Sequence, residues 1–183
     1  LLETMYTYGL TNVETDPDFY AQVPSSILQE LNDRVEIRFP EVDHSRSAAL
    51  QKRYKPGDDI KVKVQVKNIK SLLVRIFEIN THSWFQNNTS QISVNVPLHG
   101  LVPSQERSIT FDGPAALLQE STVEFPTLKK RGVFLIEFIG NGKSSRALLR
   151  IGSLRIVDRL SVAGHLIYVY DESNKLLTTN ANS

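Results

Sequence analysis

The chain has 183 residues, of which 40% are hydrophobic and 22% charged, and its formal net charge at pH 7 is +1. This composition indicates a globular chain that can bury roughly two thirds of its unfolded surface, and the balanced charge gives no reason to expect nucleic acid or an anionic membrane as a partner. Because the sequence contains no cysteine, a disulfide scaffold, a zinc–thiolate site and a cysteine nucleophile are excluded.

The N-terminal stretch, residues 1–34, is predicted to be an arm with one short helix. A capping-box pattern begins at Ser26 and ends at Gln29, which indicates a helix start. The apolar face of this helix would be formed by Ile27, Leu28 and Leu31.

The sequence carries no targeting or membrane signal. Its first residues lack a basic start and an apolar run, so they do not form a signal peptide. No stretch approaches the roughly 20 apolar residues that cross a bilayer, and we predict no membrane insertion. Since the sequence also lacks an initiating methionine, we expect it to be a piece of a longer protein.

Short strands dominate the rest of the chain. In residues 60–67, four β-branched residues alternate with four polar ones, which indicates a strand with one buried and one solvated face. Because turn-forming residues separate the predicted strands, we predict an antiparallel β-sandwich of about seven strands over residues 35–152, with one or two helical turns at 115–120. The other predicted strands are 72–79, 92–96, 109–111, 123–125, 133–139, 146–151, 154–157 and 166–170.

A break at Gly152 is predicted to be a domain edge. Residues 153–183 then contain two or three strands, which are too few to be stable alone. We expect them either to pack on the main sandwich or to begin a following module.

A Gly-Lys-Ser sequence that begins at Gly142 matches the tail of a phosphate-binding loop. A Walker-type loop needs another glycine where this sequence has Glu137, whose carboxylate would repel a phosphate. The dinucleotide fingerprint fails as well, because Ser145 stands where its third glycine is required. Asn141 followed by glycine between two apolar runs is instead a strong hairpin signal, so we predict a turn.

The remaining polar residues form no recognisable catalytic or metal-binding motif. The four histidines are far apart in the sequence, with no carboxylate at ligand spacing, and neither a Gly-x-Ser-x-Gly nor a His-Glu-x-x-His motif is present. Calcium binding by Asp16, Asp18, Asp58 and Asp59 is a lesser alternative, because these residues fit turns better. We predict that the chain is not an enzyme and has no catalytic residue, cofactor or metal site.

Two surface features are candidates for contact with a partner. Trp84 and Phe85 stand beside a polar stretch, and Lys129, Lys130 and Arg131 make a basic tip. Together they are the predicted interaction surface.

Other polar residues have a less specific interpretation. Lys61, Lys63 and Lys67 share one face of the predicted strand 60–67, where lysines usually keep a sheet soluble and block edge pairing. Asn87 and Asn88 both fit the N-x-Ser/Thr pattern, which predicts an exposed loop and possible glycosylation sites if the protein enters a secretory pathway.

Several segments together resemble a macroglobulin-like domain of the α2-macroglobulin family, in particular the large bacterial and protist-type members. The resemblance covers roughly residues 35–152, and the segment after Ala163 is similar to the opening of a next module. It implies an immunoglobulin-like or macroglobulin-like β-sandwich. The segments that carry it are 54–60 (a Y-x-P-G-x-x-V strand entry), 66–69, 73–80, 97–101, 131–138 and 144–150.

The resemblance implies a non-catalytic structural module in a larger protease inhibitor or trap. Its partners would be neighbouring modules of the same polypeptide and, through the parent protein, proteases, in an extracellular, secretory or periplasmic compartment. Family members that trap proteases covalently use a cysteine-based thioester, which this chain cannot hold, and residues 41–53 are short for a bait region. The alternative is an immunoglobulin-like adhesion module that binds a protein or glycan, and a phosphate-binding enzyme built on Lys143 is a third hypothesis.

Overall fold

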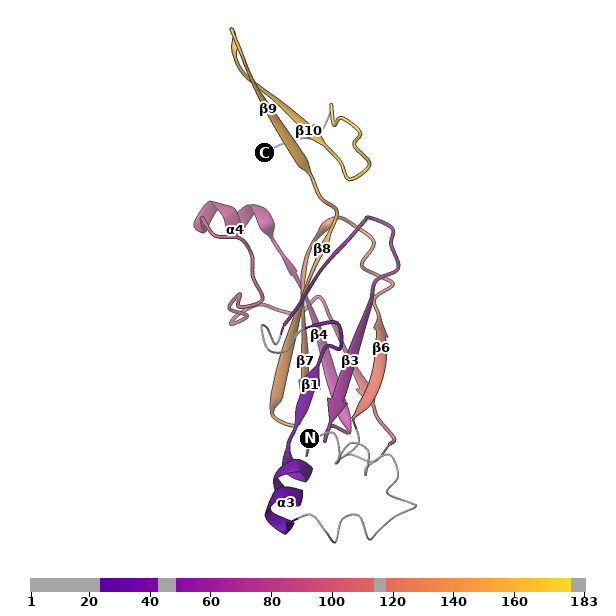
Figure 1. The fold of residues 1–183 in the computed structure, drawn as a ribbon. Helices are drawn as coiled ribbons and strands as arrows, with labels where there is room; N and C mark the ends of the chain where they lie inside the picture. The colour runs from indigo at the N-terminus through magenta and orange to yellow at the C-terminus, as the bar shows by residue number, and fades with distance from the viewer. Residues whose placement is uncertain (1–23, 43–48, 114–117, 179–183) are drawn as a thin grey trace.

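The computed structural model describes residues 24–42, 49–113 and 118–178 of the chain. Within these residues the chain forms two β-sheets, a hairpin that extends beyond one end of them, and two helices (Figure 1). The prediction of an all-β sandwich is confirmed.

The short N-terminal helix predicted from the sequence is present as α3 (Ser25–Asp33). The capping box is wrong, because Pro24 occupies the cap and no side chain accepts a hydrogen bond from the first turn. Proline has a backbone angle suited to a helix start and no N–H to leave unpaired there, so the helix begins one residue before Ser26. The predicted apolar face lies among side chains that the structure does not describe.

Eight strands build the described sandwich, against about seven predicted. They are β1 (Glu36–Arg38), β2 (Leu50–Tyr54), β3 (Lys61–Lys67), β4 (Ser71–Ile79), β5 (Gln105–Thr110), β6 (Gln119–Glu124), β7 (Gly132–Gly140) and β8 (Lys143–Ile151). One sheet has the order β1-β3-β6 and the other the order β2-β8-β7-β4-β5. The prediction of purely antiparallel pairing needs one correction, because β2 runs parallel to β8. A parallel pair requires a long crossover connection, and the chain between these two strands supplies it.

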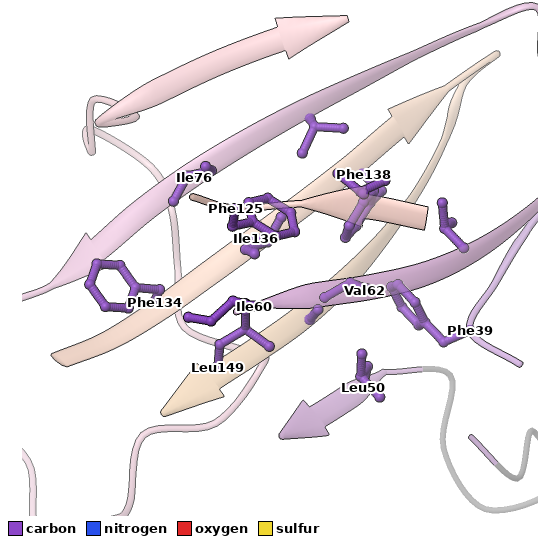
Figure 2. Packing of buried hydrophobic residues seen from close by; sticks show 14 of the residues in the cluster. Phe39, Leu50, Ile60, Val62, Ile76, Phe125, Phe134, Ile136, Phe138 and Leu149 are labelled. Carbon is purple, nitrogen blue, oxygen red and sulfur yellow. The ribbon is translucent and has the colours of Figure 1, made fainter. Parts of the chain in front are cut away.

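The main core lies between the two sheets, as the alternation in β3 predicts. Val62, Val64 and Val66 are fully buried. They belong to one buried cluster with residues of the larger sheet, among which Figure 2 shows Val62. The rings of Phe39 and Phe138 meet edge to face with centroids 5.4 Å apart. Each such buried side chain stabilises the fold by about 1.5–3 kcal/mol relative to exposure, so this core holds the sandwich together.

A second, smaller core lies on the outer face of the larger sheet. Phe77 of β4, Leu135 of β7 and Leu148 of β8 contribute to it, and Ile92 and Val96 pack against them from the connection between β4 and β5. We call residues 92–98 of this connection the covering segment. It buries a sheet face that would otherwise be open to solvent.

Two arginines of β8 hold the covering segment in place. Arg146 Nη1 donates to the carbonyl oxygens of Val94 and Val96, at 3.3 and 3.2 Å. Arg150 Nη2 donates to the carbonyl oxygen of Ile92 at 2.6 Å. The strand predicted for residues in this segment is therefore wrong, because its carbonyl groups are satisfied by guanidinium groups rather than by a neighbouring strand.

Four further elements differ from the sequence prediction. Helix α4 (Thr81–Asn87) was not predicted, nor were β1 and β2. The helical turns predicted at 115–120 are wrong at their end, because Gln119 and Glu120 belong to β6, and residues 114–117 lie outside the described part. Here pairing with β3 decides the local structure rather than helix propensity.

The predicted turn between β7 and β8 is confirmed. Asn141 and Gly142 both have positive φ, at 44° and 74°, and Gly140 pairs with Lys143 across the turn. Two consecutive positive φ values match the right-handed twist of the flanking strands. A strand follows this loop, not the helix that a phosphate-binding loop requires.

The last two strands form a separate two-stranded sheet. β9 (Arg155–Ser161) pairs with β10 (Gly164–Tyr170), and the hairpin points away from the sandwich (Figure 1). The chain reaches it through Gly152, whose φ of 84° few other residues adopt. A Cβ at this position would lie 2.9 Å from Cγ of Arg131, so glycine also permits a close approach.

Candidate interaction sites

The described part of the chain offers no metal site and no membrane span. No group of three or more histidine and acidic side chains is placed there to hold an ion. None of its helices has the length and apolar character needed to cross a bilayer. The surface features that the sequence predicts for contact with a partner can be located in the structure.

The two predicted aromatic contact residues lie on α4 but have different environments. The side chain of Asn80 caps this helix by accepting from the backbone N–H of Ser83 at 3.0 Å. Trp84 is half-buried against the second core, and its indole N–H donates to the carbonyl oxygen of Ser90 at 2.9 Å. Phe85 is 56% exposed. The structure therefore places the tryptophan in a packed position and leaves the phenylalanine open to solvent.

A groove of about 330 Å³ lies between α4, the end of β4 and the chain around Leu101, and we call it the α4 groove. Its lining is mostly apolar and amide side chains, and Glu78 is its one charged residue among those that the structure describes. The lining residues are Glu78, Ile79, Asn80, Ser83, Trp84, Asn87, Asn88, Val96, Pro97 and Leu101. Sequence analysis identified the tryptophan here but not the carboxylate.

The two predicted glycosylation positions lie at the end of α4, not in a loop. The side-chain amide of Asn87 donates to the carbonyl oxygen of Ser83 at 2.9 Å, and that of Asn88 to the carbonyl oxygen of Trp84 at 3.0 Å. These bonds satisfy carbonyl groups that the helix end would leave free. Glycosylation at either asparagine stays a prediction.

The predicted basic tip does not present three free charges. Lys129 Nζ lies 2.8 Å from the Asp59 carboxylate, and this hydrogen bond lowers the pKa of Asp59. Arg131 Nη1 lies 2.8 Å from the Glu172 carboxylate. Of the three basic residues, Lys130 is the one without an ion pair among the described residues. A role of the tip in partner contact stays a prediction.

The interpretation of the lysine stripe is partly wrong. Strand β3 lies between β1 and β6, so its lysines do not protect a sheet edge. Lys61 Nζ lies 2.6 Å from the carboxylate of Glu124 on β6, a bond that raises the pKa of Lys61. Lys67 was predicted to be exposed, but only 8% of its surface is accessible to solvent. Cross-strand charge pairs of this kind stabilise the pairing of neighbouring strands.

The pairing of Arg131 with Glu172 joins the end of the sandwich to the turn after β10. The pKa of Glu172 is lowered mainly because its own backbone N–H donates to the carboxylate, with further contributions from the N–H of Ser153 and from Arg131. Arg131 Nη2 also donates to Oε1 of Glu172 at 2.9 Å. We call this contact, together with Gly152, the joint.

One face of the β9–β10 hairpin carries large apolar side chains, most of them open to solvent, around an ion pair between His165 and Asp158. The alternation of side chains across paired strands places Ile156, Leu160, Ile167 and Val169 on the same side. Leu160 is 79% exposed, and both isoleucines are 65% exposed. We call these four residues the hairpin apolar face.

The other face of the hairpin carries more polar and aromatic side chains, and its Leu166 is 46% exposed. The guanidinium of Arg155 lies 4.9 Å from the ring centroid of Tyr170, and Val157 is paired with Tyr168. The two strands were predicted from the sequence, but the exposed apolar side chains on one face of the hairpin were not. The positions of Ile156 and Leu160, four residues apart, place both on one face of the strand, with Asp158 between them.

Comparisons of sequence indicate an immunoglobulin-like domain. The family model described as the AbpF first immunoglobulin-like domain matches residues 72–152. Actin-binding protein F from Dictyostelium discoideum is 38% identical over 149 residues, which are 80% of this chain and 6% of that protein. The chain thus spans only a small part of the length of this relative.

Comparisons of structure find macroglobulin-like domains among the similar folds. A structure of native alpha-2-macroglobulin from Escherichia coli spanning domains NIE-MG1 has a TM-score of 0.46 at 12% identity and covers 79% of this chain and 73% of that one. Another, spanning MG0-NIE-MG1, has a TM-score of 0.44 at 12% identity and covers 77% of this chain and 46% of that one. Likeness at this level carries no argument about activity or partners.

Proposed function

We propose that this chain is a non-catalytic immunoglobulin-like module of a longer protein and that it acts by packing on neighbouring modules of the same polypeptide. The observation that carries the proposal is the exposed hairpin apolar face. A two-stranded hairpin in water is marginally stable, and here it leaves large apolar side chains uncovered. A following module that packs on this face would stabilise both parts.

The energetics of the hairpin support this proposal. Covering one leucine or isoleucine stabilises a structure by about 1.5–3 kcal/mol when burial is complete, and the face has three such exposed side chains. The joint adds orientation, because the Arg131–Glu172 pair restrains the turn after β10 and Gly152 fixes the path into β9. A hairpin held at one angle presents the same face to whatever follows it.

The test compares amide hydrogen exchange of β9 and β10 in residues 1–183 with exchange in the longer protein that contains them. We expect much slower exchange in the longer protein, because the hairpin is covered there. Leu160→Gln should restore fast exchange. The control is Arg159→Gln, the adjacent residue on the opposite face of β9, which should leave exchange unchanged. Equal exchange in the two proteins, or equal effects of the two variants, would contradict the proposal.

A second candidate function is a contribution to actin binding. It is favoured by the 38% identity to a protein named actin-binding protein F. The measurement is co-sedimentation of residues 1–183 with actin filaments. Saturable pelleting that the filaments cause would support this function, and pelleting no greater than without filaments would reject it for this part of the protein.

The narrower hypothesis, a scaffold module in a protease-trapping relative of α2-macroglobulin, is also a proposal. It rests on the sequence resemblance of residues 35–152 described above. Labelled methylamine reacts with a live thioester, so stoichiometric incorporation into the intact parent protein would support a covalent trap. Absence of incorporation would rule out a live thioester and leave a non-covalent trap or an adhesion module.

A further inference from the structure

We propose that the α4 groove binds an extended segment of another protein, in which an apolar side chain is next to a lysine or arginine. The groove lies on the sandwich itself, whereas the module packing proposed above uses the hairpin apolar face. The two proposals therefore use different residues and fail separately. Three features of the groove lead to this one: its size, its apolar lining and its unpaired carboxylate.

The size and lining of the groove suit side chains of a peptide. Its volume of about 330 Å³ is at the lower end of the range for ligand sites and holds a few side chains. Ile79 and Val96 are buried, Trp84 is half-buried and Leu101 is exposed, so apolar surface continues from the second core out to solvent. A partner that inserts an apolar side chain would extend an existing core.

Exposed apolar residues continue beyond the lining. Phe85 and Val102, which directly follow the lining residues Trp84 and Leu101, are 56% and 86% exposed. Exposed aromatic and aliphatic side chains of this kind are typical of surfaces that contact proteins. They favour a protein segment over a glycan, which would need more polar groups around the site.

The charge of the groove defines the polar part of its partner. Glu78 is exposed, is the one charged residue among the described lining residues, and makes no ion pair within the described part of the chain. The nearby Arg75 is already paired with Glu106, at 2.7 Å. A lysine or arginine beside the inserted apolar side chain would complement this carboxylate, whereas an acidic segment would be repelled.

The experiment selects binders from a phage-displayed library of random peptides on residues 1–183 and then titrates a synthetic peptide of the consensus sequence. Trp84 is the only tryptophan and lines the groove, so its fluorescence reports occupancy directly. We expect a consensus with an apolar residue next to a lysine or arginine, and a shift of Trp84 emission to shorter wavelength on binding.

Matched variants then locate the binding. Leu101→Asp should weaken binding by about tenfold or more, because it places a charge in the apolar contact. Glu78→Gln should weaken it by about three- to fivefold, as expected for an exposed ion pair. Asp112→Asn is the control, since this exposed carboxylate follows the end of β5 that pairs with the opposite end of β4. It should change nothing.

Several outcomes would overturn the proposal. They are recovery of no binding peptide, a consensus without a basic residue, binding that leaves Trp84 emission unchanged, and equal affinities for the Glu78→Gln and wild-type chains. None of these results bears on hydrogen exchange in the hairpin, so failure here is distinguishable from failure of the proposed module packing.

Discussion

Replacing Arg146 by alanine would remove two of the three arginine hydrogen bonds that hold the covering segment on the larger sheet. Its guanidinium donates to two carbonyl oxygens of that segment and lies 2.9 Å from a carboxylate oxygen of Glu137. Glu137 is 12% exposed and would lose its partner, while the 30% exposure of Arg146 allows solvent to screen part of the interaction. We therefore expect the free energy of unfolding to fall by about 2–4 kcal/mol.

Urea unfolding followed by two signals measures this effect. Trp84 packs against the second core, so its emission should shift to longer wavelength and change at lower urea than the circular dichroism of the sheets. Arg75→Ala is the matched control. This arginine pairs with Glu106 on the same sheet but has 39% exposure, and its loss should cost less than about 1 kcal/mol.

A double variant separates the charge from the packing. Arg146→Met with Glu137→Leu removes both charges and keeps the bulk of both side chains, so part of the lost stability should return. The reasoning is refuted if Arg146→Ala costs no more than Arg75→Ala, or if Trp84 and the sheets unfold together at unchanged urea concentration.

Three other predictions follow from close contacts in the fold. Gly140→Ala should lower the free energy of unfolding by about 1–3 kcal/mol, because its Cβ would lie 2.6 Å from the side chain of Ile69. The loss should be smaller in an Ile69→Ala background, and urea unfolding measures both. Phe39→Ala should cost about 3–5 kcal/mol in the same assay, because the ring is fully buried between the sheets. The joint should weaken in acid: hydrogen bonds hold the pKa of Glu172 below its ordinary value of 4.5, so the stabilisation is fully present above that pH and is lost as pH falls through the lower, folded-state pKa. The protection factors of amides in the turn after β10, which correct for the pH dependence of intrinsic exchange, should then fall at low pH, and Arg131→Gln should reduce this dependence.

The strands that could be predicted from the sequence are those whose local pattern and pairing agree. The alternation in β3 and the Asn141-Gly142 turn were sufficient to locate these elements, because side-chain period and turn geometry are local properties. The short strand β1 and the parallel partner β2 were not predicted. Their pairing depends on strands far along the chain, and five residues or fewer give little pattern.

The interaction surfaces were harder to predict than the fold. Trp84 was identified by residue type, but its place in a groove depends on the covering segment, which two arginines of β8 fix from more than fifty residues away. The basic tip shows the opposite error, because the sequence predicts a charged surface there and the structure neutralises most of it. Lys129 and Arg131 are adjacent to a third basic residue in sequence, yet each is paired with an acid from a distant segment.

The placement of β8 has a mechanical consequence. This strand leads directly into the joint and the hairpin, at the end of the molecule opposite α3 (Figure 1). A pull transmitted through the hairpin acts along β8, whose nine residues pair with β7 and of which five also pair with β2. Many hydrogen bonds would then share the load at once. A pull from the other end reaches β1, which has only three paired residues, so tension along the module should detach that end first and leave the sandwich closed.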